Sequence, residues 1–150
     1  MAARDPKDVI EELMRRTAAR DFAVIDELIA EDMVNHAAGG ENDTRGPQGR
    51  EGWKRIVAMI DHDLGDDITV DHHHVFSEGD FVIDHMTIRG RHRASTMPLL
   101  EGTEVTQLPV GWTYIHIWRV VDGMVVEHWA CRDDLGLLRQ VGAWPPANAS

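Results

Sequence analysis

Two histidines, His116 and His128, stand in strand-like sequence on either side of the turn signal Asp122-Gly123. Because side chains alternate between the two faces of a strand, such a hairpin can place both imidazoles on one face. A neutral imidazole gives or takes a proton near pH 7, and a pair with separated pKa values could supply an acid and a base. The spacing therefore predicts either a proton-transfer site or two hydrogen-bonded structural histidines.

Two further positions carry titratable groups that could serve the same chemistry. His85 follows Asp84 directly, so only one of them faces inward on a regular strand. We expect His85 to face inward, and Asp84 to take its place if the alternation is opposite. Asp133 precedes Asp134 and a leucine-rich stretch, where a carboxylate caps the free amides of a helix; Asp133 could also act as a reserve acid at a pocket mouth.

The run His72-His73-His74 raises the question of a metal site, since alternate histidines on a strand can share a metal ion. Metal folds that use this pattern also need an acidic ligand and a distant histidine in glycine-marked strands, and they lack leading helices. We therefore expect no metal and no organic cofactor.

Charge and composition narrow the classes of partner. The formal net charge is −11, from 15 Lys and Arg against 26 Asp and Glu, and such a field repels phosphate backbones and anionic lipids. We expect no nucleic acid and no membrane partner. The densest basic group consists of Arg89, Arg91 and Arg93. These arginines either pair with neighbouring residues of the protein or bind an anionic group of a substrate.

Length and cysteine content indicate one domain in a reducing compartment. The 150 residues, 43% hydrophobic and 27% charged, are enough for a single globular domain over 1–150. Cys131 is the one cysteine, so no intramolecular disulfide can form, and the start of the chain lacks the apolar core of a secretory signal. A cytoplasmic location is expected.

The elements that must position these residues are helices first and strands afterwards. Helices are predicted from Asp5-Pro6, from Asp21, around an apolar stripe that includes Trp53, and from Asp133 or Asp134 to before Gly142. Runs rich in β-branched and aromatic residues predict four strands, at 68–76, 81–89, 112–121 and 124–131. The segment 94–110 is interrupted by prolines and a glycine, and we expect an irregular crossover there.

This order of elements is typical of an α+β fold rather than of alternating α/β units. A strongly curved antiparallel sheet wrapped against three N-terminal helices would enclose a cavity. Trp53, Met86 and Trp118 are the large apolar side chains expected to wall a hydrophobic pocket.

Three stretches resemble the SnoaL-like polyketide cyclase family, which has the nuclear transport factor 2-like fold and includes predicted ester cyclases. The run from Ile115 to Gly142 is similar to the family's closing hairpin and helix. Arg89-Gly90-Arg91-His92 resembles the family's strand end, and Met33-Val34-Asn35-His36 resembles the segment that enters its pocket. Together the likeness covers most of the chain and is weakest over 95–110.

The resemblance implies a cone with a pocket between sheet and helices, a small hydrophobic organic ligand, and a homodimer formed through the sheet. It also implies roles for single residues: His116 matches a family histidine, and Asn35 and His36 would hold a substrate oxygen. The family's cyclases use an aspartate two residues after the position of His128, and this chain has Ala130 there. That departure argues against direct transfer of the cyclase chemistry, so Ala130 is expected only to line the pocket.

Three functions remain open. The first is an enzyme that acts on a small, largely apolar carbonyl-type metabolite by proton transfer, as in aldol cyclisation, isomerisation or hydration. The second is a non-catalytic protein that binds a hydrophobic metabolite in the same cavity, and the third is a dimeric accessory subunit.

Overall fold

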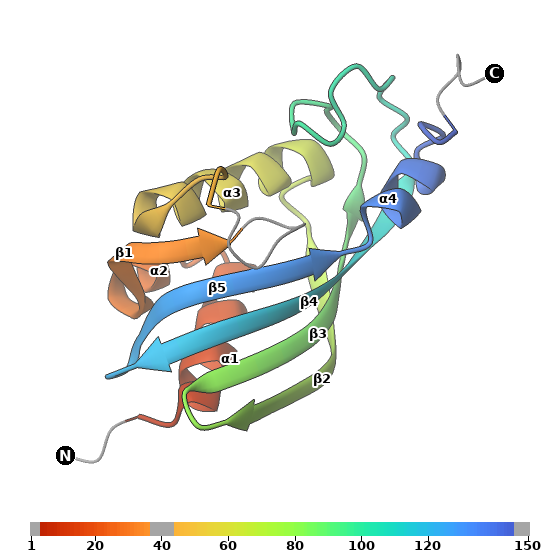
Figure 1. Ribbon diagram of the computed structural model, residues 1–150. Helices are drawn as coiled ribbons and strands as arrows, with labels where there is room; N and C mark the ends of the chain where they lie inside the picture. Colours follow the sequence, from red (N-terminus) through yellow and green to blue (C-terminus); the bar gives the residue numbers. More distant parts are fainter. Residues whose placement is uncertain (1–3, 37–43, 146–150) are drawn as a thin grey trace.

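The computed structural model describes residues 4–36 and 44–145. Its helices are α1 (Pro6–Ala18), α2 (Ala23–Leu28), α3 (Gly49–Leu64) and α4 (Asp134–Gln140). Its strands are β1 (Ile29–His36), β2 (Thr69–Glu78), β3 (Phe81–Arg91), β4 (Pro109–Val121) and β5 (Met124–Arg132). This arrangement confirms the predicted α+β class (Figure 1).

The strands form one curled sheet in the order β1-β5-β4-β3-β2. The four strands from β2 to β5 pair antiparallel, as the turn signals predicted, and β1 adds to the edge in parallel with β5. The sheet is therefore mixed, and the prediction of a purely antiparallel sheet of four strands was wrong at this edge. The chain leaves α2 directly as β1 at Ile29, where the sequence analysis predicted no strand.

The helices cover the concave face of the sheet (Figure 1). Asp5 caps α1 by accepting a hydrogen bond from the Lys7 amide at 2.9 Å, as predicted, and α1 then crosses β2, β3 and β4. Its buried residues Val9, Ile10 and Leu13 pack into the core. α3 lies along β1, and its end approaches β3 so closely that a Cβ at Gly90 would lie 2.5 Å from the carbonyl oxygen of Leu64.

The predicted irregular crossover connects β3 to β4 and is fixed by one buried carboxylate. Asp63, at the end of α3, accepts hydrogen bonds from the backbone amides of Thr96 and Met97 at 2.8 and 2.7 Å. Buried His92 closes the same segment through Ser95 and Thr106. The segment is therefore held over the concave side, where Met97 contributes to the pocket.

Within the described residues no helix combines the length and apolarity needed to cross a bilayer.

Candidate active site

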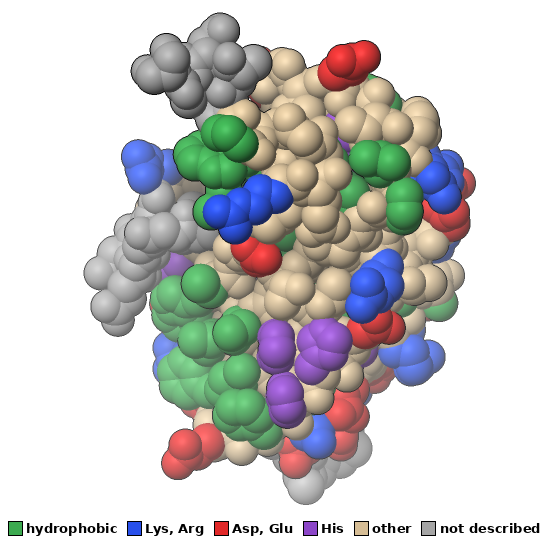
Figure 2. Space-filling model, turned by 90° about the vertical axis from the view of Figure 1, so that its right-hand side faces the viewer, with side chains coloured by type: hydrophobic (Ala, Val, Ile, Leu, Met, Phe, Trp, Pro, Cys, Tyr) green, Lys and Arg blue, Asp and Glu red, His purple; other side chains and the backbone are tan. Residues whose placement is uncertain are grey.

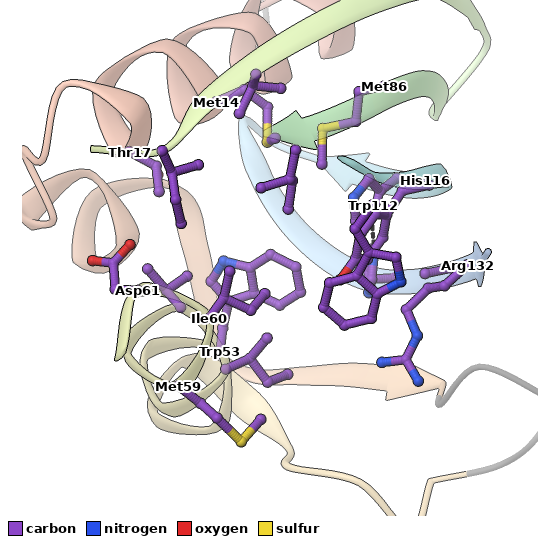
Figure 3. A pocket seen from close by; sticks show the side chains of 18 of the residues that line it. Met14, Thr17, Trp53, Met59, Ile60, Asp61, Met86, Trp112, His116 and Arg132 are labelled. Atoms are coloured by element: carbon purple, nitrogen blue, oxygen red, sulfur yellow. Dashed lines mark hydrogen bonds between the residues drawn. The ribbon is translucent and has the colours of Figure 1, made fainter. Parts of the chain in front are cut away.

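A pocket of about 320 Å³ opens between the concave face of the sheet and the helices. Its walls are mostly apolar, and Figure 3 shows Met86 on the sheet side facing Trp53 and Ile60 of α3 across the cavity. Polar side chains reach the pocket at several places. One group is formed by Asn35, His116 and His128. Arg132 lies near the edge, and Thr17, Arg20, Asp61 and Asp66 line another part of the wall.

Strand alternation brings His116 and His128 to one face, as predicted. Every second residue of β4 from Val110 to Val120 is buried, and His116 belongs to that set. His128 follows the same rule on β5, where it lies opposite Trp118. The two imidazoles meet with Nδ1 of His116 at 2.8 Å from Nε2 of His128.

The hydrogen-bond chain continues to β1 and sets the position of every proton in it. The amide Nδ2 of Asn35 donates to the carbonyl oxygen of Pro47 at 3.1 Å, so its Oδ1 faces Nδ1 of His128 at 2.7 Å. An amide oxygen only accepts, and Nδ1 of His128 therefore carries the proton. Nε2 of a neutral His128 must then accept from Nδ1–H of His116, which leaves Nε2 of His116 as a bare lone pair.

Burial keeps both histidines neutral. Loss of hydration lowers the pKa of His116 to about 3, with smaller contributions from His72 and Arg132. Burial, together with the neighbouring His116, holds the pKa of His128 well below the usual range. Nε2 of His116 is buried and has no hydrogen-bond partner among the described residues, so the hydrogen-bond chain ends in one unsatisfied acceptor nitrogen.

Asn35 and His36 both border the pocket, and each also has contacts within the protein. The amide of Asn35 bonds Pro47 and His128, which orients His128, and its Nδ2 has a second N–H group. The ring of His36 stacks on Trp129 with centroids 4.6 Å apart and bonds Glu127 at 2.9 Å, while its Nδ1 has no partner among the described residues. A role of either residue in holding a substrate oxygen therefore stays a prediction.

Among the expected apolar wall residues, Trp53, Met86 and Ala130 line the pocket. Trp118 does not. It is fully buried beneath the two histidines, with its ring centroid 4.2 Å from that of His128 and 5.1 Å from that of His116. Its role is to pack the histidine pair from below, so the prediction that it contacts substrate was wrong.

His85 points away from the pocket, which corrects the predicted alternation of β3. The inward residues of that strand include Asp84 and Met86, and His85 packs on the outer face against His74, 3.1 Å away between their Nδ1 atoms. Because Met86 is inward, its neighbour His85 cannot be inward on a regular strand. Asp84 takes the inward position, 1% exposed.

The histidine run of β2 is divided between the faces of the sheet. A register shift between His72 and His74 places His72 inward, where its Nδ1 bonds Asp84 at 2.9 Å. His73 lies outward and bonds the hydroxyl of Thr87 at 2.8 Å. In the part of the chain that the structure describes, no three His, Cys, Asp or Glu side chains are grouped as a metal site.

Asp133 caps α4 and does not reach the pocket. Its carboxylate accepts a hydrogen bond from the Gly136 amide at 2.9 Å, and it is exposed. The expectation of a reserve acid at the pocket mouth is therefore contradicted, because the cap holds the carboxylate outside. None of Arg89, Arg91 and Arg93 lines the pocket either.

Arg132 is one of the polar pocket residues that sequence reasoning missed. It lies two residues beyond Ala130 on β5, so alternation from His128 could have found it. Its guanidinium sits 5.3 Å over the ring of Trp112 and bonds Asp134 at 3.0 Å. Asp134 also accepts from the indole N–H of Trp112 at 3.1 Å, which fixes the cation at the edge of the cavity (Figure 3).

Comparisons with known proteins place these features in a family. The family model described as SnoaL-like polyketide cyclase matches residues 8–141. Among solved structures, IdmH of Streptomyces antibioticus, a candidate polyketide cyclase, is 29% identical with a TM-score of 0.75, over 93% of this chain and 99% of its own. No protein with a curated description matches the chain significantly.

Two more distant structures show the same fold. TsrD of Streptomyces laurentii is 22% identical with a TM-score of 0.74, and the match covers 91% of this chain and 96% of TsrD. AclR of Streptomyces galilaeus, a candidate hydroxylase, is 22% identical with a TM-score of 0.76, and the match covers 93% of this chain and 86% of AclR.

Proposed function

The chain belongs to the SnoaL-like polyketide cyclase family, and from this premise we propose that it is a pocket enzyme acting by proton transfer without a cofactor. The substrate class is a small, largely apolar carbonyl-type metabolite, and the reaction is an aldol cyclisation, an isomerisation or a hydration. The observation that carries this proposal is the chain from Asn35 through His128 to His116, which lines an apolar pocket and ends in an unpaired acceptor nitrogen.

The arrangement supports a division of labour among the polar groups. Nε2 of His116 accepts a hydrogen bond from the substrate or from a water molecule that acts on the substrate, because its other nitrogen is committed to His128. Asn35 and His128 hold His116 in one tautomer, as second partners of catalytic imidazoles do. Arg132 faces the carbonyl or oxyanion end of the substrate, because a guanidinium is a strong donor to such oxygens.

A binding protein without turnover is the second candidate, and Ala130 is the observation that favours it. Ala130 lines the pocket directly opposite His116 in the β4–β5 register, where the family's cyclases carry an aspartate. An apolar wall at that point suits retention of a hydrophobic ligand as well as it suits catalysis.

The two candidates separate in one experiment. Carbonyl compounds of polyketide type are screened for binding by thermal shift, and each binder is then incubated with the protein and followed for product. The His116→Gln variant of an enzyme should lose turnover at least 10-fold while ligand affinity stays within about threefold. Binding without product formation in the wild-type protein would decide for the second candidate.

We also propose a homodimer formed through the outer face of the sheet, in the cytoplasm. The outer face exposes large apolar side chains, with Phe76 57%, Phe81 40%, Ile115 45% and Ile117 36% exposed. Figure 2 shows one face of the molecule on which hydrophobic side chains gather beside histidines. A contiguous apolar surface of this kind marks an interaction site in a water-exposed sheet.

A further inference from the structure

Five side-chain polar atoms are buried without a hydrogen-bond partner among the described residues, and two of them belong to directly paired residues of β4 and β3. These two are Nε2 of His116 and Oδ2 of Asp84, in side chains that are 4% and 1% exposed. Oδ1 of the same carboxylate is bonded to His72, so the second oxygen alone is unsatisfied. A buried group of this kind costs about 1–3 kcal/mol when left unpaired, so a shared partner is expected for both.

The strand register places the two atoms on one face and side by side. Asp84 of β3 is the direct partner of His116 on β4, and the β carbons of such pairs lie about 4.5–5.5 Å apart. The two nitrogens of an imidazole lie on different edges of the ring. Because Nδ1 of His116 is bonded to His128 of β5, on one side of β4, Nε2 is directed toward the opposite side, which is β3.

The electrostatics of His116 agree with this direction. After burial, His72 is the next cause that lowers the pKa of His116, so the pair of His72 and Asp84 lies close to this ring. Nε2 of His116 and the carboxylate oxygen are both acceptors, and they cannot bond each other. A water molecule has the two O–H groups needed to join them.

We propose that Asp84 and His116 bind a water molecule at the wall of the pocket, and that this water carries a proton from the substrate to the carboxylate. In register, His116 is flanked by Ala130 on β5 and by Asp84 on β3. The family's cyclases carry a carboxylate at the position of Ala130 on β5, and in this chain Asp84 supplies a carboxylate from β3 instead. Of the two buried carboxylates in the described chain, Asp63 anchors the crossover, and Asp84 is left for this role.

The proton balance favours such an acceptor. Because Nε2 of a neutral His116 has a single lone pair, the water that bonds it, and not the nitrogen itself, takes the proton from a carbon or oxygen of the substrate; in the same step the water gives one of its own protons to Oδ2 of Asp84. The substrate loses a proton and becomes negatively charged, Asp84 gains a proton and becomes neutral, and His116 ends neutral. Because burial makes a lasting imidazolium unfavourable at His116, a second acceptor is needed.

His72 connects this site to solvent without passing through the pocket. Its side chain is 36% exposed, and its Nδ1 lies 2.9 Å from Oδ1 of the carboxylate. Asp84 and His72 are therefore positioning residues that act through the water and His116. The proton-transfer step rests on the proposed function, whereas the water site does not.

The water site is tested first by a high-resolution crystal structure of the ligand-free protein. The expected result is one solvent oxygen within about 3.2 Å of both Nε2 of His116 and Oδ2 of Asp84. Direct contact of the two side chains, or an oxygen that belongs to an organic molecule in the pocket, would overturn the proposal. This experiment needs no variant and no substrate.

The coupling is tested by ¹⁵N NMR of the imidazole nitrogens at pH 7.5 in the wild-type protein and in Asp84→Asn. The variant keeps the shape of the side chain and removes the acceptor pair, so the Nε2 resonance of His116 should move while those of His128 stay in place. The control is Asp71→Asn, which removes a charge from the exposed side of β2 and should move neither resonance. An unchanged Nε2 resonance in Asp84→Asn refutes the coupling even if His116→Gln abolishes turnover. A protein without turnover that still shows the water and the shift would refute only the proposed reaction.

Discussion

Lowering the pH from 8 to 5 should destabilise the folded protein by about 2 kcal/mol through His116, and His128 should add to this loss. Burial makes the neutral form of both imidazoles the native one, since the pKa of His116 falls to about 3 and that of His128 falls well below its usual range. In the unfolded chain the same groups bind a proton below about pH 6.5. The unfolded state therefore binds protons that the native state does not bind, and the free energy of unfolding decreases as the pH falls.

The magnitude follows from the proton equilibrium of each group. At pH 5 an imidazole with a pKa of about 6.5 gains about 2 kcal/mol by protonation, and a native imidazole with a pKa of about 3 gains almost nothing. The loss between pH 8 and pH 5 is therefore about 2 kcal/mol for His116, and the lowered pKa of His128 gives a loss of the same sign. Above pH 7 neither state binds the proton, and the effect disappears.

Urea denaturation at pH 8, 7, 6 and 5 measures this loss in the wild-type protein and in His116→Gln. The variant should be less stable at pH 8, because the hydrogen bond to His128 is weakened, but its deficit should shrink by about 2 kcal/mol at pH 5. Met86→Leu, which changes the pocket wall without removing a titratable group, is the control and should show a deficit that does not depend on pH. A deficit of His116→Gln that stays constant from pH 8 to pH 5 would refute the neutral, buried histidine pair.

Three further predictions address the pocket, the crossover and the outer face. Ala130→Asp places a carboxylate opposite His116, so the pKa of His116 should rise from about 3. The free energy of unfolding at pH 8 should fall by about 1–3 kcal/mol, because the new carboxylate is buried without a partner. An NMR titration with no change at His116 would contradict the strand register. Asp63→Asn should lower the free energy of unfolding by about 1–3 kcal/mol and speed hydrogen exchange of the Met97 amide. Although burial opposes ionisation, the hydrogen bonds lower the pKa of Asp63, so the wild-type protein is the more stable one above about pH 4 and its advantage shrinks below that pH. Slow exchange in the variant would argue against this anchor. Ile117→Lys on the outer face should convert a dimer to a monomer in light scattering, and a wild-type protein that is already monomeric would exclude the sheet dimer.

Sequence patterns predicted those helices and strands whose ends are marked by a strong capping or turn signal. The capping pair Asp5-Pro6 marked the start of α1, and the turn Asp122-Gly123 marked the hairpin that joins β4 to β5. Strand β1 was missed because it carries Glu31 and Asp32 and pairs in parallel, so no hairpin turn announces it. Its residue Asn35 was nevertheless expected at the pocket from the family resemblance.

The inward face of β3 could not be read because both of its faces are apolar. Phe81 and Ile83 point outward while Val82 and Met86 point inward, so hydrophobicity does not reveal which of Asp84 and His85 is buried. His85 and Met86 could not both face the pocket, because neighbouring residues of a regular strand point to opposite faces. The register of neighbouring strands, which no single segment encodes, resolves the choice in favour of Asp84.

This ambiguity and the proposed dimer have the same physical origin. Strands whose two faces are both covered lose the alternation of apolar and polar residues and read as continuous hydrophobic runs. In β4, Trp118 faces the core while Ile115 and Ile117 face outward and are partly exposed in the single chain. If a second copy covers that outer face, the missing alternation is explained, and the error over His85 follows from an interface rather than from an irregular strand.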